Sequence, residues 1–467
     1  MPWNLVSSYL PFSLPPAYVA HFYGIIFTLF AMFYSVLGGM QSIVWGDVIK
    51  YCIMTVACVA VAVIAMGRLE GHTLNVPEGW SSPFFGWHLD MDWSKIIHEV
   101  NDKIKEDGFS VFGALFMMML FKGVLASLAG PAPNYDMQKI LSTRSPGEAA
   151  KMSGFVSIIL LPIRYSMVIG FTVLGLLYYD QLNLKGVDGA GHSFVDFERI
   201  LPSAINSFLP AGVLGLVLTG LLGAFMGTFA GTLNAGQAYI VNDIYLKYIN
   251  PNATLKRVIG MNYLAAIVVV TLGIVIGLYA KSVNDMLQWI VGGLYGGYIA
   301  SNVLKWHWWR FNASGYFWGM MAGIVSALLL PLAMDKLPDV FTEKLPLFYF
   351  PLLLLIALGG SVAGTLLTAP TDVEVLKQFY KTVRPWGFWS PIHRLVVADD
   401  PSFTGNGNFK LDAFNVVIGI VAQLCLTILP MYFVLGMRLP LLVTVGILGV
   451  CVLVLKRTWW DRLELGN

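Results

Sequence analysis

Four ionisable side chains lie within long apolar runs of this sequence, at Asp47, Lys50, Lys122 and Arg164. A charge costs free energy inside a bilayer, so each is a functional candidate if these runs cross a membrane. Asp47 and Lys50 are three residues apart and share one helix face. They suit either an ion pair at the membrane interface or a part in closing one side of a transport path.

Lys122 and Arg164 could meet a negatively charged solute. Lys122 suits either a lysine that reaches an outer aqueous vestibule or a charge that faces a substrate cavity. Arg164 follows Pro162 by two residues. Its guanidinium stays charged and its fork of donors fits a carboxylate, but it equally suits a structural bond to carbonyls that the proline frees.

The apolar run 110–142 is interrupted by Gly130, Pro131, Ala132 and Pro133. Proline has no backbone N–H and leaves carbonyl groups unpaired. Irregular backbone at membrane depth is tolerated where it is buried or lines a cavity, and discontinuous helices form the binding sites of many secondary transporters. We therefore expect Gly130 and Pro131 to border a substrate site, the alternative being a simple kink.

A second polar interruption holds Gly227, Thr228 and Thr232. Hydroxyl oxygens one turn apart suit a hard cation such as sodium. The small residues of this stretch equally suit close helix packing, which spacing alone favours. Gln288 lies beside another glycine-rich stretch, 292–297, which lacks the Lys-Ser/Thr ending of a phosphate-binding loop. We find no catalytic constellation and no metal-ligand spacing, so we expect no enzyme and no cofactor other than a coupling ion.

The composition indicates that these residues are carried by membrane-spanning helices. Of the 467 residues, 57% are hydrophobic and 12% are charged, against about 25% charged in soluble domains. The net charge of +2 gives no reason to expect a nucleic-acid partner. A bilayer core requires about 20 apolar residues per helix. Eleven candidate spans follow, at about 19–37, 43–66, 110–142, 152–179, 209–245, 258–280, 284–304, 315–334, 346–368, 413–435 and 438–455.

Lysine and arginine gather in connections that share one side if the spans alternate, as in the loop that holds Lys139 and in the C-terminal segment. The positive-inside rule makes that side cytoplasmic. The segment 369–412 is then the largest cytoplasmic connection, an ordered loop with an amphipathic helix. The sequence has no basic signal-peptide start. We expect a multi-pass protein of the bacterial inner membrane with a cytoplasmic C-terminus.

The run from Tyr34 to Lys50 contains Tyr34, then Gly-Gly, then Trp-Gly-Asp ending at Asp47. It resembles a signature of the sodium/solute symporter family, whose members include sodium–glucose, sodium–proline and sodium–pantothenate carriers. The family pattern has Thr where this chain has Gly46, and Gln where it has Lys50. Two further runs, 138–151 and 233–245, are similar to family motifs in the same order.

The resemblance implies an all-α membrane protein with a leucine-transporter-type fold, in which five helices are repeated inverted. We expect a single transmembrane domain over 1–467, with a partial inverted-repeat core at 19–304 and peripheral helices at 305–467. The family normally has about four spans before its Tyr…Gly-Gly signature. This sequence has one partial span there, so we expect the fold to be N-terminally incomplete.

The resemblance also implies site residues. Family sodium binding uses two adjacent hydroxyl residues, which map to Gly227 and Thr228; one hydroxyl is absent, and Thr232 is placed to compensate in part. Gln288 lies where sugar carriers place a substrate-contacting glutamine. The aromatic pair that gates the sugar site falls on Ala129 and Gly130, which argues against a sugar.

The leading hypothesis is sodium-coupled symport of a small organic solute by alternating access, with sodium near Thr228. Asp47, Lys50 and Lys139 would close the cytoplasmic side, and Arg164 and Lys122 favour an anionic solute. The expected partners are sodium, the solute and the lipid bilayer. The alternatives are a non-transporting membrane sensor or scaffold, an inactive truncated carrier, and a proton-coupled carrier.

Overall fold

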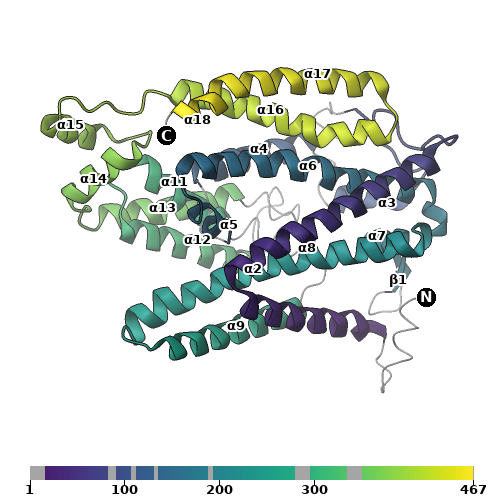
Figure 1. The fold of residues 1–467 in the computed structure, drawn as a ribbon, viewed down its shortest axis with the longest axis horizontal. Helices are drawn as coiled ribbons and strands as arrows, with labels where there is room; N and C mark the ends of the chain where they lie inside the picture. The colour runs from purple at the N-terminus through teal and green to yellow at the C-terminus, as the bar shows by residue number, and fades with distance from the viewer. Residues whose placement is uncertain are drawn as a thin grey trace. The chain divides into compact units, whose positions relative to one another are not determined.

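The computed structural model describes residues 16–82, 91–106, 112–130, 135–182, 184–187, 193–278, 295–333 and 350–465. These residues are helical apart from connecting loops and one short ribbon (Figure 1). The ribbon pairs β1 (Lys185–Val187) with β2 (Ser193–Val195) in antiparallel register, with Gly186 opposite Phe194.

Six helical segments in the described residues are long and apolar enough to cross a bilayer, and four more are apolar but shorter. These ten segments coincide with ten of the eleven expected spans. The eleventh, at 284–304, lies partly outside the described residues and ends in α11 (Tyr295–His307). The expected spans from 110–142 onward correspond, apart from α11, to α4 (Phe112–Leu128), α6 (Pro146–Leu177), α8 (Ala211–Ala238), α9 (Leu255–Leu278), α12 (Ala313–Ala333), α13 (Phe350–Leu366), α16 (Phe409–Val434) and α17 (Arg438–Leu455).

The first two expected spans belong to one helix, α2 (Pro16–Leu69), which is 54 residues long. No proline interrupts the chain between them, so the backbone hydrogen bonds can continue. Figure 1 shows that the two arms of α2, before and after this join, run in different directions. The helix therefore supplies two apolar segments, His21–Val36 and Val44–Leu69.

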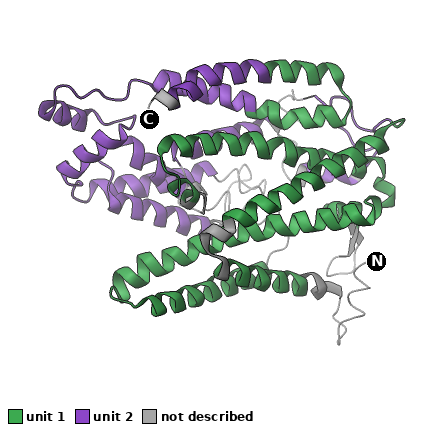
Figure 2. Cartoon of the chain, in the orientation of Figure 1, with its two compact units in different colours: residues 1–72, 133–280, 423–447 green, residues 73–132, 281–422, 448–467 purple. Residues whose placement is uncertain are grey.

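The chain divides into two compact units (Figure 2). The first consists of 1–72, 133–280 and 423–447 and contains α2, α5 (Tyr135–Leu141), α6, α8 and α9. Within it α2 packs along α6 and α8 through a fully buried stripe of Ala57, Val61 and Ala65. Glycine lets the backbones approach closely: a Cβ on Gly170 of α6 would lie 2.9 Å from Val61 Cγ1.

The second unit consists of 73–132, 281–422 and 448–467. Its helices α12 and α13 pack through small residues: a Cβ on Gly360 would lie 2.8 Å from Ala322 Cβ, and one on Gly364 would lie 2.9 Å from the Ser314 carbonyl oxygen. Such close contact between spans is the use of small residues in membranes. At the α11 contact the hydroxyls of Ser301 and Ser361 are hydrogen-bonded at 3.0 Å.

The segment 369–412 is more structured than the expected loop with one helix. It holds α14 (Val373–Val383) and α15 (Ser390–Asp399), which enclose their own buried cluster of Leu376, Tyr380, Trp389, Ile392 and Val396. Asp372 caps α14 by accepting hydrogen bonds from two backbone N–H groups, as N-cap residues do. Two aromatic residues of this segment, Tyr380 and Trp389, thus serve its local packing.

Candidate functional site

The three residues expected to close the cytoplasmic side form one charged cluster in the first unit. Asp47 Oδ1 lies 3.5 Å from Lys50 Nζ, one turn along α2. Asp47 Oδ2 lies 3.3 Å from Lys139 Nζ, which comes from α5 and is 92 residues away in the sequence. One carboxylate therefore holds two ammonium groups and ties α2 to α5.

The cluster rests on α8 at two glycines. A Cβ on Gly227 would lie 2.8 Å from Asp47 Oδ1, and a Cβ on Gly223 would lie 3.1 Å from Lys50 Cγ. Either would displace a charged side chain, so glycine at both positions makes room for the cluster. The position that the family resemblance assigned to sodium, Gly227, is thus in contact with Asp47.

An aromatic ring completes the surroundings of Lys50. Its Nζ lies 4.8 Å from the centroid of the Tyr34 ring, within the range of a cation–π interaction. The Tyr34 hydroxyl in turn lies against Gly46, where a Cβ would overlap it. Gly46 is the position at which this chain departs from the family's Trp-Thr-Asp, and the contact supplies a steric reason for the glycine.

The two threonines proposed for sodium lie on α8, and both are exposed. Thr232 Oγ1 donates a hydrogen bond to the Thr228 carbonyl oxygen at 2.9 Å. A hydroxyl oxygen that donates still has lone pairs for a cation. The Thr232 hydroxyl therefore still has lone pairs that could bind sodium, and sodium binding by these two threonines stays a prediction.

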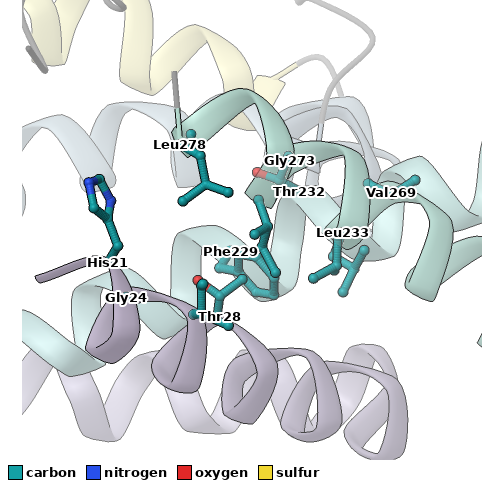
Figure 3. Close-up of a pocket in the computed structure, with 13 residues that line it drawn as sticks. His21, Gly24, Thr28, Phe229, Thr232, Leu233, Val269, Gly273 and Leu278 are labelled. Carbon is teal, nitrogen blue, oxygen red and sulfur yellow. The ribbon is translucent and has the colours of Figure 1, made fainter. Parts of the chain in front are cut away.

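A pocket of about 440 Å³ lies between the first arm of α2, α8 and α9 (Figure 3). Its lining is mostly apolar, and Thr28, Thr232 and His21 supply its polar side chains. Sequence reasoning did not select His21 or Thr28. A threonine and a histidine inside the apolar run 19–37 were the available signal, but only the fold brings them opposite Thr232.

The helix break expected after α4 is present. The helix ends at Leu128, and Gly130 has φ +73°, a left-handed conformation that favours glycine. Trp306 Nε1 of α11 donates a hydrogen bond to the Ala129 carbonyl oxygen at 3.0 Å, so a side chain satisfies a carbonyl that the break leaves unpaired. Pro131 and the rest of the break, at 131–134, lie outside the described residues.

The other candidate substrate residues belong to different compact units or lie outside the described residues. Lys122 is half-buried on α4, in the second unit. Arg164 is exposed on α6 in the first unit and forms no hydrogen bond or ion pair with the residues the structure describes. Gln288 lies outside the described residues. Their role as substrate contacts therefore stays a prediction.

Outside the spans, the main charge cluster joins α14 to α15. Lys377 Nζ lies 3.0 Å from Glu374 and 2.9 Å from Asp399. The hydrogen bond to Asp399 raises the pKa of Lys377, and the same bond lowers the pKa of Asp399. The pair supports the packing of these two helices on their own cluster.

Comparison with known proteins identifies the family of this chain. The model of the Sodium:solute symporter family matches residues 18–323. The chain is 26% identical to a sodium/glucose cotransporter of Vibrio parahaemolyticus over 66% of its length, and 22% identical to a sodium/sialic acid symporter of Aliivibrio fischeri over 70%. It is 20% identical to a sodium/proline symporter of Haemophilus influenzae over 76%. It spans 56%, 61% and 65% of these relatives' own lengths.

The fold is similar to that of a solved Na⁺-coupled sialic acid symporter in a substrate-bound outward-open state. The TM-score is 0.52 at 15% identity, covering 79% of this chain and 71% of that one. The match confirms the expected fold class, an all-α membrane protein with a leucine-transporter-type fold. The matched family model covers well over half of the chain, and the apolar helices make it multi-pass. The chain is therefore an integral membrane protein that belongs to the sodium:solute symporter family.

Proposed function

We propose that this chain carries out sodium-coupled symport of a small organic solute by alternating access. The observation that carries the proposal is the meeting of Asp47, Lys139 and Gly227, because it joins residues of two family motifs to a position that the family resemblance assigns to sodium binding. The relatives support the substrate class, since each is named for sodium together with a sugar, a sugar acid or an amino acid.

Sodium would bind at α8, with Thr228 as its principal hydroxyl ligand and Thr232 as the second. Gly227 contributes a backbone carbonyl and no side-chain oxygen. Sodium is a hard cation, and the hydroxyl and carbonyl oxygens available on this face are ligands of the appropriate type. The loss of one hydroxyl at Gly227 would weaken the site relative to one with two.

The charged cluster would hold the cytoplasmic side closed. Lys139 lies in a short helix that contacts α8, and its ion pair with Asp47 fastens that helix to α2. Opening the path on that side would part the ion pair. The assignment of this side, and of the C-terminus, as cytoplasmic rests on the lysine and arginine residues of the adjoining loops.

The solute would bind beside the break at Gly130 and Pro131, with Gln288 and Lys122 as polar contacts. Arg164, which pairs with none of the residues that the structure describes, and Lys122 on α4 favour a carboxylate-bearing solute. A sugar is disfavoured because Ala129 and Gly130 stand where sugar carriers have their aromatic pair. Trp306, which bonds at the break, is the aromatic residue placed to contact a bound solute there.

The experiment is uptake into proteoliposomes that contain the purified chain. Labelled carboxylates, amino acids and sugars are offered with an inward sodium gradient and with choline in place of sodium. We expect uptake of one class to require sodium and to weaken in Thr228→Ala. The matched control is Thr219→Ala, because Thr219 is also exposed on α8 and donates to the carbonyl four residues earlier. Uptake that does not depend on sodium would refute the coupling.

A second candidate function is a membrane sensor that keeps the fold without transport. The observation that favours it is the environment of Asp47, which two lysines already neutralise. It predicts no uptake of any solute from protein that is folded and correctly inserted.

A further inference from the structure

The Lys50 side chain follows a defined path between α2 and α8. Its Cβ and Cγ lie 3.3 and 3.1 Å from where a Cβ of Gly223 would stand, and its Nζ lies 3.9 Å from the corresponding point on Gly227. Only 17% of the side chain is exposed. The ammonium group therefore lies near Gly227, the same residue of α8 that Asp47 contacts.

Both carboxylate oxygens of Asp47 are in use. Oδ1 faces Lys50 and Oδ2 faces Lys139, so one negative charge meets two positive charges. Two ammonium groups therefore lie within 3.5 Å of this one carboxylate. A metal cation that approached Asp47 would be repelled by the adjacent Lys50 ammonium and would have to displace an ammonium group from a carboxylate oxygen.

Two departures from the family signature meet at this carboxylate. Lys50 stands where the family has glutamine, and Gly227 stands where it has a hydroxyl residue. A side chain at position 227 would lie 2.8 Å from Asp47 Oδ1 and 3.9 Å from Lys50 Nζ. The two departures are physically linked, because the glycine leaves the space in which Asp47 and the Lys50 ammonium sit together.

We propose that the Lys50 ammonium is a built-in cation that occupies Asp47 and excludes metal cations from it. The inference rests on the proposed function, because the exclusion of sodium from Asp47 would leave the Thr228 and Thr232 oxygens as the sodium ligands. Lys50 is then a determinant of cation selectivity: it supplies permanently, from the protein, the positive charge that a free ion would otherwise bring to this carboxylate.

The test is a gain of sodium binding. The full chain is placed in lipid nanodiscs, and equilibrium binding of radioactive sodium is measured at constant ionic strength with choline as the balancing cation. Lys50→Gln removes the charge and keeps a polar side chain that cannot replace it. We expect the sodium affinity to rise by about tenfold or more, since a unit charge within a few ångströms of the ion is removed.

Two further variants assign the effect to Asp47. The double variant D47N/K50Q should return to the parent affinity, because the carboxylate that gains the ion is absent. Lys50→Arg keeps the charge and should also bind as the parent does. Lys50→Met, which keeps the length of the side chain, replaces K50Q if that protein is not monodisperse.

An unchanged or weaker sodium affinity in both uncharged variants would overturn the proposal, as would a gain that persists in D47N/K50Q. The result is independent of uptake. A parent protein that transports without sodium would contradict the proposed function, and K50Q could still gain sodium at Asp47.

Discussion

Replacing Lys139 by glutamine removes the charge that ties α5 to α2. Two unit charges 3.3 Å apart interact by about 5 kcal/mol at an effective dielectric constant of 20. Desolvation and the competing Lys50 offset most of this energy. For a pair whose side chains are 28% and 33% exposed, we expect a net coupling of about 1–2 kcal/mol.

That coupling should appear as local opening of α5. A loss of about 1–2 kcal/mol shifts an opening equilibrium by about 5–30-fold. Amide hydrogen exchange of the seven-residue helix α5 should accelerate by this factor in Lys139→Gln, while exchange in α16 stays as in the parent. The matched control is Lys256→Gln, which removes an exposed lysine on α9 in the same unit.

The second arm of this experiment is a double-mutant cycle. Asp47→Asn should also accelerate amide hydrogen exchange of α5. The two changes together should have less effect on this exchange than the sum of the single effects, because they remove one shared interaction. Exchange in α5 that is unchanged in both single variants, or effects that add fully, would refute the argument that this ion pair fastens the helix.

Three further predictions concern the second unit. Gly360→Leu should lower the melting temperature by overpacking α12 against α13, at a cost of about 1–3 kcal/mol or more, whereas Gly359→Leu, with nothing within 4 Å of its Cβ position, should melt as the parent does. Trp306→Phe removes the indole N–H that bonds to the end of α4, so exchange there should accelerate by a factor that reflects about 1–2 kcal/mol; unaltered exchange would contradict the role of this bond. The lowered pKa of Asp399 and the raised pKa of Lys377 stabilise the α14–α15 contact above the ordinary carboxyl pKa of about 4 and below the ordinary lysine pKa of about 10. Trp fluorescence should therefore report an intact α14–α15 contact between about pH 4 and pH 10, and loss of the contact below and above that range. A loss of the contact with its midpoint near neutral pH would refute this.

Much of the fold could be predicted from the sequence because the bilayer imposes a strong local requirement. A span needs about 20 apolar residues, so ten of the eleven expected spans have helical counterparts in the described residues. The joining of the first two spans into α2 was not predicted. Gly38 and Gly39 lie where the two spans join, and no proline there prevents the helical hydrogen bonds from continuing.

The candidate site was predictable only where its members are close in sequence. The pairing of Asp47 with Lys50 follows from their spacing on one helix, and the distance of 3.5 Å agrees with it. The ion pair to Lys139 crosses 92 residues. No local pattern specifies which carboxylate a lysine in a distant loop will meet, so grouping these residues as a gate required the family resemblance.

The sequence by itself determined that the chain lies in a membrane, where its spanning helices lie and to which family it belongs, because hydrophobicity and motif order can be read directly from the residues. Tertiary structure alone decided what each polar group meets. It placed Gly227 against Asp47, laid Lys50 along Gly223, and brought the Trp306 indole to the end of α4. These outcomes depend on how each helix is rotated and how closely two backbones approach, and an ångström-scale change in either would exchange an ion pair for a gap.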